Sequence, residues 1–435
     1  MSQEIVTFGC RLNTYESEVI RLALQKADLQ NVIVFNTCAV TQEAERQAMQ
    51  AIRKAKRKNP DQKIIVTGCA AQINPQKYAN MIEVDQVLGN EEKLSHHNYL
   101  ENAAKINVND IMEVKDTALH MVASFDGKAR AFIQIQNGCN HRCTFCTIPF
   151  GRGNSRSVAI GAITQQVKLL VEQGFNEVVL TGVDVTDYGL DLPGKPTLGQ
   201  MIKRLLNLVP NLPRLRLSSI DVAEIDDELF NLLTSEPRLM PHIHISLQSG
   251  DNMILKRMKR RHNREQVIEF CNKVRALRPG VAFGADIIAG FPTETDEMFQ
   301  NSLDLIAEAG IAHGHIFAYS KRDDTPAARM PQVAPQIRKT RARQLREACA
   351  VQLDKLIQAN IGTNQQVIIE QNNCGHSQNF LKLHFAQELA PGTLVNARIV
   401  GYEDGRILAT ESFTGLTGES RNAGGPRVKP VDEYL

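Results

Sequence analysis

Hydrophobic and polar residues in the first hundred positions repeat one pattern three times. A short run of β-branched and apolar residues, which indicates a buried strand, ends each time at a cysteine; the runs are 4–10, 32–38 and 63–69. The segments 17–27 and 41–59 between them have the helical period. Alternating strands and helices predict a parallel sheet with right-handed crossovers, whose strands all end at one edge.

A second series of strand-like runs follows further along the chain. Helical segments separate the six runs, which are 131–136, 177–183, 214–220, 242–248, 282–291 and 312–320. Six strand–helix units predict a partial (βα)6 barrel of the TIM type, with its site at the carboxyl ends of the strands. A basic helix over 335–359 comes next. Short strands and glycine-containing turns over 362–410 then predict a small antiparallel β-barrel.

These patterns define an α/β chain with five segments. We expect an α/β sheet domain at 1–103, a linker with one short strand at 104–124, a barrel at 125–358, a small β-barrel at 359–416 and a disordered tail at 417–435. The tail is rich in glycine, proline and charge, which disfavours a packed core.

The three cysteines that end the first strands form the first candidate site. Cys10, Cys38 and Cys69 lie at equivalent positions. Because the carboxyl ends of parallel strands meet at one edge, where ligands bind, we expect these thiols to share a metal site. Three unconnected core cysteines are the alternative, since free cysteine is often buried.

Another three cysteines follow the first strand of the predicted barrel. Cys139, Cys143 and Cys146 have C-x3-C-x2-C spacing on one loop. Three thiolates on a short loop can hold three irons of a cubane cluster and leave the fourth iron open, as catalytic metal sites leave one position open. A zinc knuckle is the alternative, but zinc usually takes two close ligand pairs and no second pair follows nearby.

With Phe145 just before the third cysteine, this spacing resembles the radical S-adenosylmethionine enzymes. In that family the open iron binds the amino and carboxylate groups of the cofactor. The resemblance, together with small and polar residues at the predicted strand ends, indicates a cofactor pocket lined by Phe145, Gly182, Ser219, Gln248 and Gly290. Ordinary residues of the barrel rim are the alternative.

The order of the three domains resembles the methylthiotransferases. These radical S-adenosylmethionine enzymes carry two [4Fe-4S] clusters and end in a nucleic-acid-binding TRAM domain. Segments 8–17, 246–250 and 319–330 resemble the subtype that acts on threonylcarbamoyladenosine in tRNA. Two residues depart from the family pattern: Asp184 stands where asparagine is common, and Thr293 where glycine is common.

The resemblance implies an enzyme that methylthiolates C2 of N6-threonylcarbamoyladenosine at position 37 of tRNA. It implies two [4Fe-4S] clusters and S-adenosylmethionine as cofactors, and a flavodoxin- or ferredoxin-like reductant. The reaction replaces the hydrogen of an unactivated aromatic C–H bond at C2. No side-chain base removes this hydrogen at neutral pH, so radical chemistry is required. The alternatives are the same chemistry on isopentenyladenosine tRNA or on a ribosomal-protein aspartate, and a non-catalytic, zinc-dependent RNA-binding protein.

Composition changes this picture only in detail. The net charge is +2, so affinity for RNA must come from local patches. Basic runs at 53–58, 256–261 and 338–346 are the candidates, although such runs are often solvated helix faces. The predicted RNA contacts within them are Lys256, Arg257, Arg260, Arg261, Arg338, Arg341 and Arg343.

Cysteine usage and the start of the chain suggest a compartment. The chain has nine cysteines, an odd number, and neither a signal peptide nor an apolar run of membrane-spanning length is visible. We therefore expect a cytoplasmic protein with reduced thiols and no membrane or DNA partner.

Overall fold

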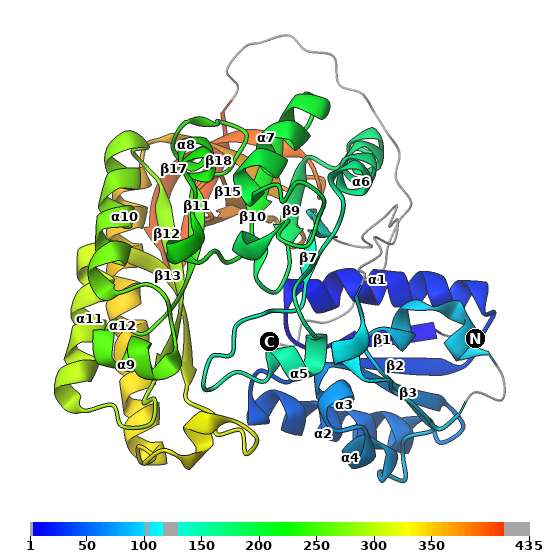
Figure 1. The fold of residues 1–435 in the computed structure, drawn as a ribbon. Coiled ribbons are helices and arrows are strands. Elements are labelled where there is room, and N and C mark those ends of the chain that lie inside the picture. Colours follow the sequence, from blue (N-terminus) through cyan, green and yellow to red (C-terminus); the bar gives the residue numbers. More distant parts are fainter. Residues whose placement is uncertain (1–2, 101–103, 116–128, 413–435) are drawn as a thin grey trace.

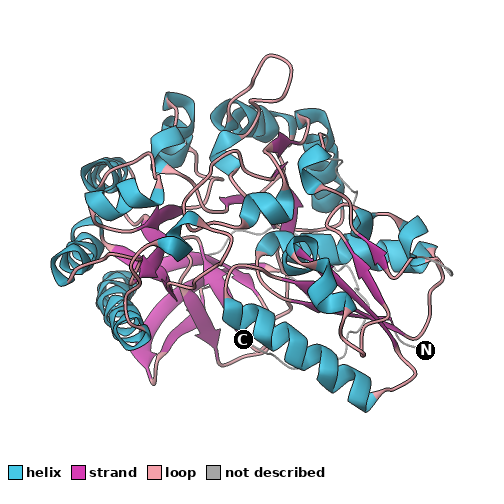
Figure 2. Ribbon diagram, turned by 60° about the horizontal axis from the view of Figure 1, so that its bottom comes forward, coloured by secondary structure: helices cyan, strands magenta, loops and turns pink. Residues whose placement is uncertain are grey.

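A computed structural model describes residues 3–100, 104–115 and 129–412. It contains an N-terminal sheet, a central barrel and a small β-barrel (Figure 1). Helices flank the strands of the N-terminal sheet and of the central barrel, as Figure 2 shows. Within the described ranges, no helix combines the length and the apolar character needed to cross a membrane. The predicted tail and residues 116–124 of the predicted linker lie outside the described residues.

The N-terminal sheet is parallel and five-stranded, in the order β1-β2-β3-β4-β5. Its strands are β1 (Gln3–Thr7), β2 (Val32–Thr37), β3 (Lys63–Gly68), β4 (Gln86–Leu88) and β5 (Ile106–Asn107). The short strand β5 therefore lies in the segment that the sequence predicts as a linker.

Helices cover both faces of this sheet. One face packs against α1 (Arg11–Lys26), and the other against α2 (Gln42–Lys58), α3 (Cys69–Ile73) and α4 (Pro75–Ala79) (Figure 1). Strands β1, β2 and β3 lie side by side in the order of the sequence, and α1 and α2 lie on opposite faces of the sheet. The crossover from β1 to β2 and the crossover from β2 to β3 therefore have opposite hands. The prediction that both are right-handed is wrong.

The central barrel contains all six predicted strands. They are β6 (Ala131–Gln134), β9 (Glu177–Thr181), β10 (Arg214–Leu217), β11 (His242–Gln248), β12 (Ala282–Ala289) and β13 (Ile311–Ala318). Two parallel sheets, β10-β9-β6 and β11-β12-β13, are joined by isolated bridges from Leu215 to Leu239 and from Ile220 to Ile245. The edge strands β6 and β13 do not pair with each other in the described sheets, so the barrel is partly open, as predicted.

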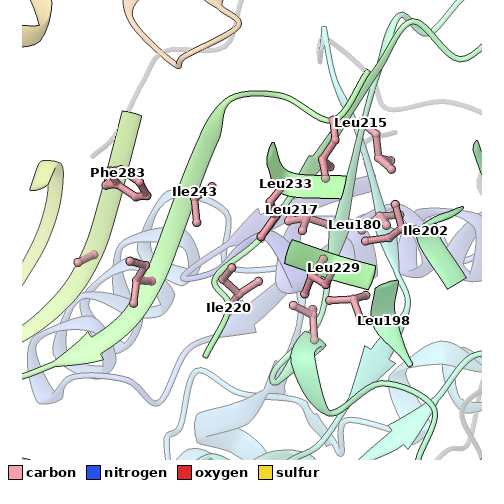
Figure 3. Packing of buried hydrophobic residues seen from close by; sticks show 14 of the residues in the cluster. Leu180, Leu198, Ile202, Leu215, Leu217, Ile220, Leu229, Leu233, Ile243 and Phe283 are labelled. Atoms are coloured by element: carbon pink, nitrogen blue, oxygen red, sulfur yellow. The ribbon is translucent and has the colours of Figure 1, made fainter. Parts of the chain in front are cut away.

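Apolar side chains between the strands and the outer helices hold the barrel together. The helices are α6 (Ile160–Glu172), α7 (Leu198–Leu208), α8 (Asp227–Ser235), α10 (Arg264–Leu277) and α11 (Asp296–Ala309). Leu198 and Leu229 from α7 and α8 pack beside Leu217 of β10 (Figure 3). Each fully buried side chain of this kind stabilises the fold by about 1.5–3 kcal/mol. Leu12 and Tyr15 of α1 belong to the same core, which ties the N-terminal sheet to the barrel.

A closed β-barrel follows the long helix α12 (Pro335–Asn360). Its strands are β14 (Asn364–Ile369), β15 (Cys374–Ser377), β16 (Lys382–Phe385), β17 (Leu394–Glu403) and β18 (Arg406–Glu411). Strands β16 and β18 pair in parallel, so the prediction of an entirely antiparallel barrel is wrong for this pair. The carbonyl of Ser377 accepts hydrogen bonds from Arg214 and Arg216 of β10, at 3.2 and 3.4 Å. The small barrel therefore covers the amino ends of the strands and leaves their carboxyl ends to the site.

Candidate iron–sulfur and cofactor site

The first cysteine trio gathers at the carboxyl edge of the N-terminal sheet. Cys38 directly follows β2, and Cys69 directly follows β3. A Cβ atom on Gly9, whose φ is +98°, would lie 2.7 Å from the Sγ of Cys38, so only glycine lets the loop of Cys10 approach so closely. Burial and the nearby thiols of Cys69 and Cys10 raise the pKa of Cys38 to about 12. The structure thus brings together the three thiols that the sequence predicts as partners.

A buried network of charges supports this trio. The Nε of Arg152 donates to the Sγ of Cys69 at 3.2 Å, and its Nη2 donates to Glu16 at 2.9 Å. The Nζ of Lys93 donates to the same carboxylate at 2.7 Å. The exposed fractions of Arg152, Glu16 and Lys93 are only 2%, 1% and 0%. Two buried cations share one carboxylate, so a thiolate or an anionic cluster is needed beside Cys69 to balance the charge, and the residues fit such a group.

The second trio lies on the loop after β7 (Gln136–Asn137). The Sγ of Cys139 is 3.5 Å from a carboxylate oxygen of Asp184, and the Sγ of Cys143 is 3.8 Å from the Nη1 of Arg260. The amide of Ile148 donates to the Sγ of Cys146 at 3.4 Å, and burial raises the pKa of this thiol to about 12. Metal binding would hold the thiols of Cys139 and Cys146 in the deprotonated form that their burial disfavours.

The two trios are joined by α5 (Ile148–Arg152), a short helix beside α3 (Figure 1). It begins two residues after Cys146 and ends at Arg152, which contacts Cys69. Gly151 packs so closely that an added Cβ would lie 3.2 Å from the Cβ of Cys69. Five helical residues span only about 7.5 Å, so both trios border the same region of the molecule.

Three of the predicted cofactor residues lie at or near the barrel rim. Phe145 packs edge-on to Phe291, with ring centroids 6.3 Å apart. A Cβ on Gly182 would meet the carbonyl of Gln136 at 2.7 Å, so glycine permits this close approach. The hydroxyl of Ser219 donates to Asp286 at 3.3 Å. Their role toward S-adenosylmethionine remains a prediction.

The other two predicted cofactor residues have distinctive backbones. Gln248, the last residue of β11, has a left-handed φ of +69°. Gly290 is buried, and a Cβ there would lie 2.4 Å from the Cγ of Arg338. Helix α12 therefore fills the space beside Gly290, whose φ of +69° also favours glycine. The role of Gln248 and Gly290 toward S-adenosylmethionine remains a prediction.

Two predicted RNA contacts are engaged inside the protein. Arg260 donates to Asp221 at 2.8 Å and to the carbonyl of Ser246 at 2.7 Å, next to the cysteine loop. Arg341 is 5% exposed and pairs with Glu294 at 2.8 Å. Protein groups therefore engage both guanidinium groups in the structure. That these two arginines bind RNA remains a prediction.

The other five predicted RNA contacts are exposed or half-buried. Lys256, Arg261 and Arg343 are exposed. Arg257 and Arg338 are half-buried and donate to Thr293 and to the carbonyl of Tyr319, each at 2.8 Å. These five residues remain predicted contacts.

Several functional residues were not found from the sequence. Besides the Arg152 network, the ring of His141 lies 3.0 Å from Asp184 and 3.4 Å from Glu224. Hydrogen bonds to Asp184 and Glu224 raise the pKa of His141 to about 10. The positive charge of His141 therefore offsets the negative charge of Asp184, which lies beside Cys139 at a position where asparagine is common. The only local signal was the position of His141 and Arg152 within a few residues of the cysteine motif.

Comparisons with known proteins agree with this geometry. The Radical SAM superfamily matches residues 133–306, and the Uncharacterized protein family UPF0004 matches residues 3–89. The radical S-adenosylmethionine methyltransferase TsrM from Kitasatospora setae shares the fold, with a TM-score of 0.55 at 14% identity over 75% of this chain and 77% of its own. The partial barrel with its cysteine loop is that of a radical S-adenosylmethionine enzyme, whose cofactors are S-adenosylmethionine and iron–sulfur clusters.

Relatives of known name identify the family within this class. A threonylcarbamoyladenosine tRNA methylthiotransferase from Rickettsia prowazekii is 63% identical over 93% of this chain and 96% of its own, and one from Aquifex aeolicus is 37% identical over 90% and 98%. A tRNA-2-methylthio-N(6)-dimethylallyladenosine synthase from Finegoldia magna is 31% identical over 92% of each chain. The chain belongs to the tRNA methylthiotransferase family, and it is an enzyme with two [4Fe-4S] clusters.

Proposed function

We propose that this enzyme methylthiolates C2 of N6-threonylcarbamoyladenosine at position 37 of tRNA. The observation that carries the proposal is the contact of Arg152, at the end of the helix that follows Cys146, with the thiol of Cys69. It joins two sites of three thiols each. The 63% identity over nearly the whole chain to a relative named for this substrate supports the choice of nucleoside.

The chain's own residues hold and orient the reacting groups. Cys139, Cys143 and Cys146 would hold one cluster, and Cys10, Cys38 and Cys69 the other. When bound, the clusters and S-adenosylmethionine supply the radical and the sulfur that an unactivated aromatic C–H bond requires. The protein fixes the separation of the two sites through α5, excludes water by burial, and balances charge with Arg152.

Single cysteine variants test this function. Replacing any one of the six by alanine should abolish methylthiolation and reduce bound iron by about half, because each cluster has only three protein ligands. Mass spectrometry of tRNA nucleosides and iron analysis of the purified protein measure both effects. Cys271→Ala, in the barrel core, is the matched control and should keep both clusters. A variant among the six with wild-type turnover would remove that cysteine from its role.

Substrate choice and partners need separate assays. The enzyme is incubated with tRNA that carries the threonylcarbamoyl group, with tRNA that lacks it, with isopentenyladenosine tRNA, and with the ribosomal protein. Only the tRNA that carries the threonylcarbamoyl group should give product. Anaerobic iron and sulfide analysis distinguishes the enzyme from a zinc-dependent RNA-binding protein. The proposal includes a flavodoxin- or ferredoxin-like reductant and a cytoplasmic location, where thiols stay reduced.

A further inference from the structure

A cavity of about 330 Å³ opens at the side of the barrel, beside the edge strand β13. Imidazoles of His242, His244 and His315 line it, together with Arg11 at the start of α1. Leu353 of α12 contributes an apolar wall. This volume lies within the range of small-molecule sites, and the lining combines a cation, hydrogen-bonding groups and an apolar surface.

Arg11 has no ion-pair partner among the residues that the structure describes. Burial, and then the charges of Arg130 and Arg216, lower the pKa of Arg11 to about 10. The nearby carboxylates are already engaged, because Glu177 pairs with Arg216 at 2.9 Å and Asp286 faces two histidines. The cavity therefore has a positive charge that the described protein groups leave unbalanced, which suits an anionic ligand.

His242 provides an independent sign of a ligand. It is only 4% exposed, and neither of its ring nitrogens has a hydrogen-bond partner among the described residues. The ring stacks on Phe380 with centroids 4.6 Å apart and lines the cavity. A buried imidazole without partners is costly, and a polar ligand in the cavity would satisfy it.

None of the six cysteines lines the cavity, but neighbouring residues connect it to both trios. Arg11 directly follows Cys10 in the chain. On the other side, the carboxylate of Asp286 is 3.2 Å from His244 and accepts the hydroxyl of Ser219 at 3.3 Å. Ser219 lies two residues before Asp221, which pairs with Arg260 beside Cys143. We therefore expect a substituent of a nucleoside held between the trios to extend toward this cavity.

We infer that this cavity receives the threonylcarbamoyl side chain of the substrate and that Arg11 binds its carboxylate. The inference rests on the proposed function and adds a residue that selects the substrate. A threonylcarbamoyl group has a carboxylate, a hydroxyl and a urea, whereas an isopentenyl group has no polar atom. The guanidinium of Arg11 can bind a carboxylate through two parallel hydrogen bonds, while an isopentenyl group would leave Arg11 and His242 unpaired.

Binding of modified RNA to the full-length, cluster-loaded enzyme tests this site. Three anticodon stem-loops are compared, with threonylcarbamoyladenosine, its uncharged primary amide, or adenosine at position 37. The wild type should bind the acid about tenfold more tightly than the amide, since a charged bidentate pair is lost. Arg11→Gln should bind acid and amide equally, with unchanged affinity for the unmodified RNA, and Arg11→Lys should retain part of the preference.

Controls separate this inference from the proposed function. Arg21→Gln, on the same helix and paired with Glu18 at 3.1 Å, should keep the full preference for the acid, and iron content should be equal in all variants. A wild type that does not distinguish acid from amide, or an Arg11→Gln variant that still does, would overturn the inference. If mass spectrometry finds methylthiolated product while Arg11→Gln keeps its preference, only the inference fails. If the preference follows Arg11 but no product forms, only the proposed function fails.

Discussion

At the scale of single residues, the chemistry depends on charges buried where no water can solvate them. Arg152 and Lys93 both donate to Glu16, and Arg152 also contacts the thiol of Cys69. Among the described residues, Glu16 is the one carboxylate that accepts hydrogen bonds from both cations. The loss of Glu16 and the loss of one cation should therefore affect stability differently. Removal of Arg152 leaves a neutral pair, whereas removal of the carboxylate charge leaves two unpaired cations.

This asymmetry predicts different stabilities for two variants. Glu16→Gln should lower the free energy of unfolding by about 3–5 kcal/mol, while Arg152→Met, of similar volume, should cost about 1–3 kcal/mol. Urea unfolding of the metal-free full-length chain measures both. Glu43→Gln, which breaks an exposed pair with Arg46, is the control and should leave the free energy of unfolding almost unchanged. Equal costs for Glu16→Gln and Arg152→Met would contradict the charge argument.

At the scale of elements, the basic helix α12 has some of its cations packed against the barrel and others exposed to solvent. Arg341 lies on the face that packs on the barrel, where it pairs with Glu294 and Asp296 at 2.8 and 2.6 Å. Lys339 and Arg343 lie on the exposed face. Successive helical residues turn by about 100°, so a run of cations cannot all face a single partner.

RNA binding should follow this division. The double variant Lys339→Gln, Arg343→Gln should weaken tRNA binding and reduce the slope of log affinity against log salt by about 1–2, because phosphate contacts release counterions. Arg341→Gln should leave that slope unchanged. It should lower the free energy of unfolding instead, because the buried carboxylate of Glu294 would lose its partner. Filter binding at salt concentrations from roughly 50 to 200 mM is the measurement. A slope that falls only in Arg341→Gln would reverse the assignment.

At the scale of the whole molecule, ion pairs at the amino ends of the barrel strands tie the small β-barrel to the core. Glu177 of β9 pairs with Arg214 and Arg216, which also donate to the carbonyl of Ser377. Arg130 pairs with Glu370 of the small barrel at 2.6 Å. Although burial acts against it, Arg216 and Arg214 lower the pKa of Glu177 from 4.5 to about 2.

This shift sets the sign of an acid dependence. A carboxyl whose pKa is lower in the folded state stabilises the fold above pH 4.5, and this stabilisation is lost as the pH falls toward 2. Glu177→Gln should therefore cost about 3 kcal/mol at neutral pH, and the difference from the wild type should shrink below pH 4.5. Urea midpoints between pH 7 and pH 3 measure it, and a difference that stays constant across that range would contradict the prediction.

Local patterns alone determined the two cysteine trios and the order of the domains. Cys38 and Cys69 end strand-like runs, and Cys139 to Cys146 lie within one loop. Strand period and motif spacing are properties of neighbouring residues, and the edge of a parallel sheet brings its strand ends together in every such fold. These features can therefore be predicted from the amino-acid sequence by itself.

Only the tertiary structure decided how the parts meet. Arg152 contacts Cys69 across 83 positions of sequence, and β16 pairs with β18 in parallel rather than with its chain neighbour β17. The burial of Arg341 and the unpaired state of Arg11 among the described residues likewise depend on which surfaces pack together. A basic or polar residue has the same local pattern whether it faces solvent or a neighbouring domain, because the energy that distinguishes the two comes from contacts distant in sequence.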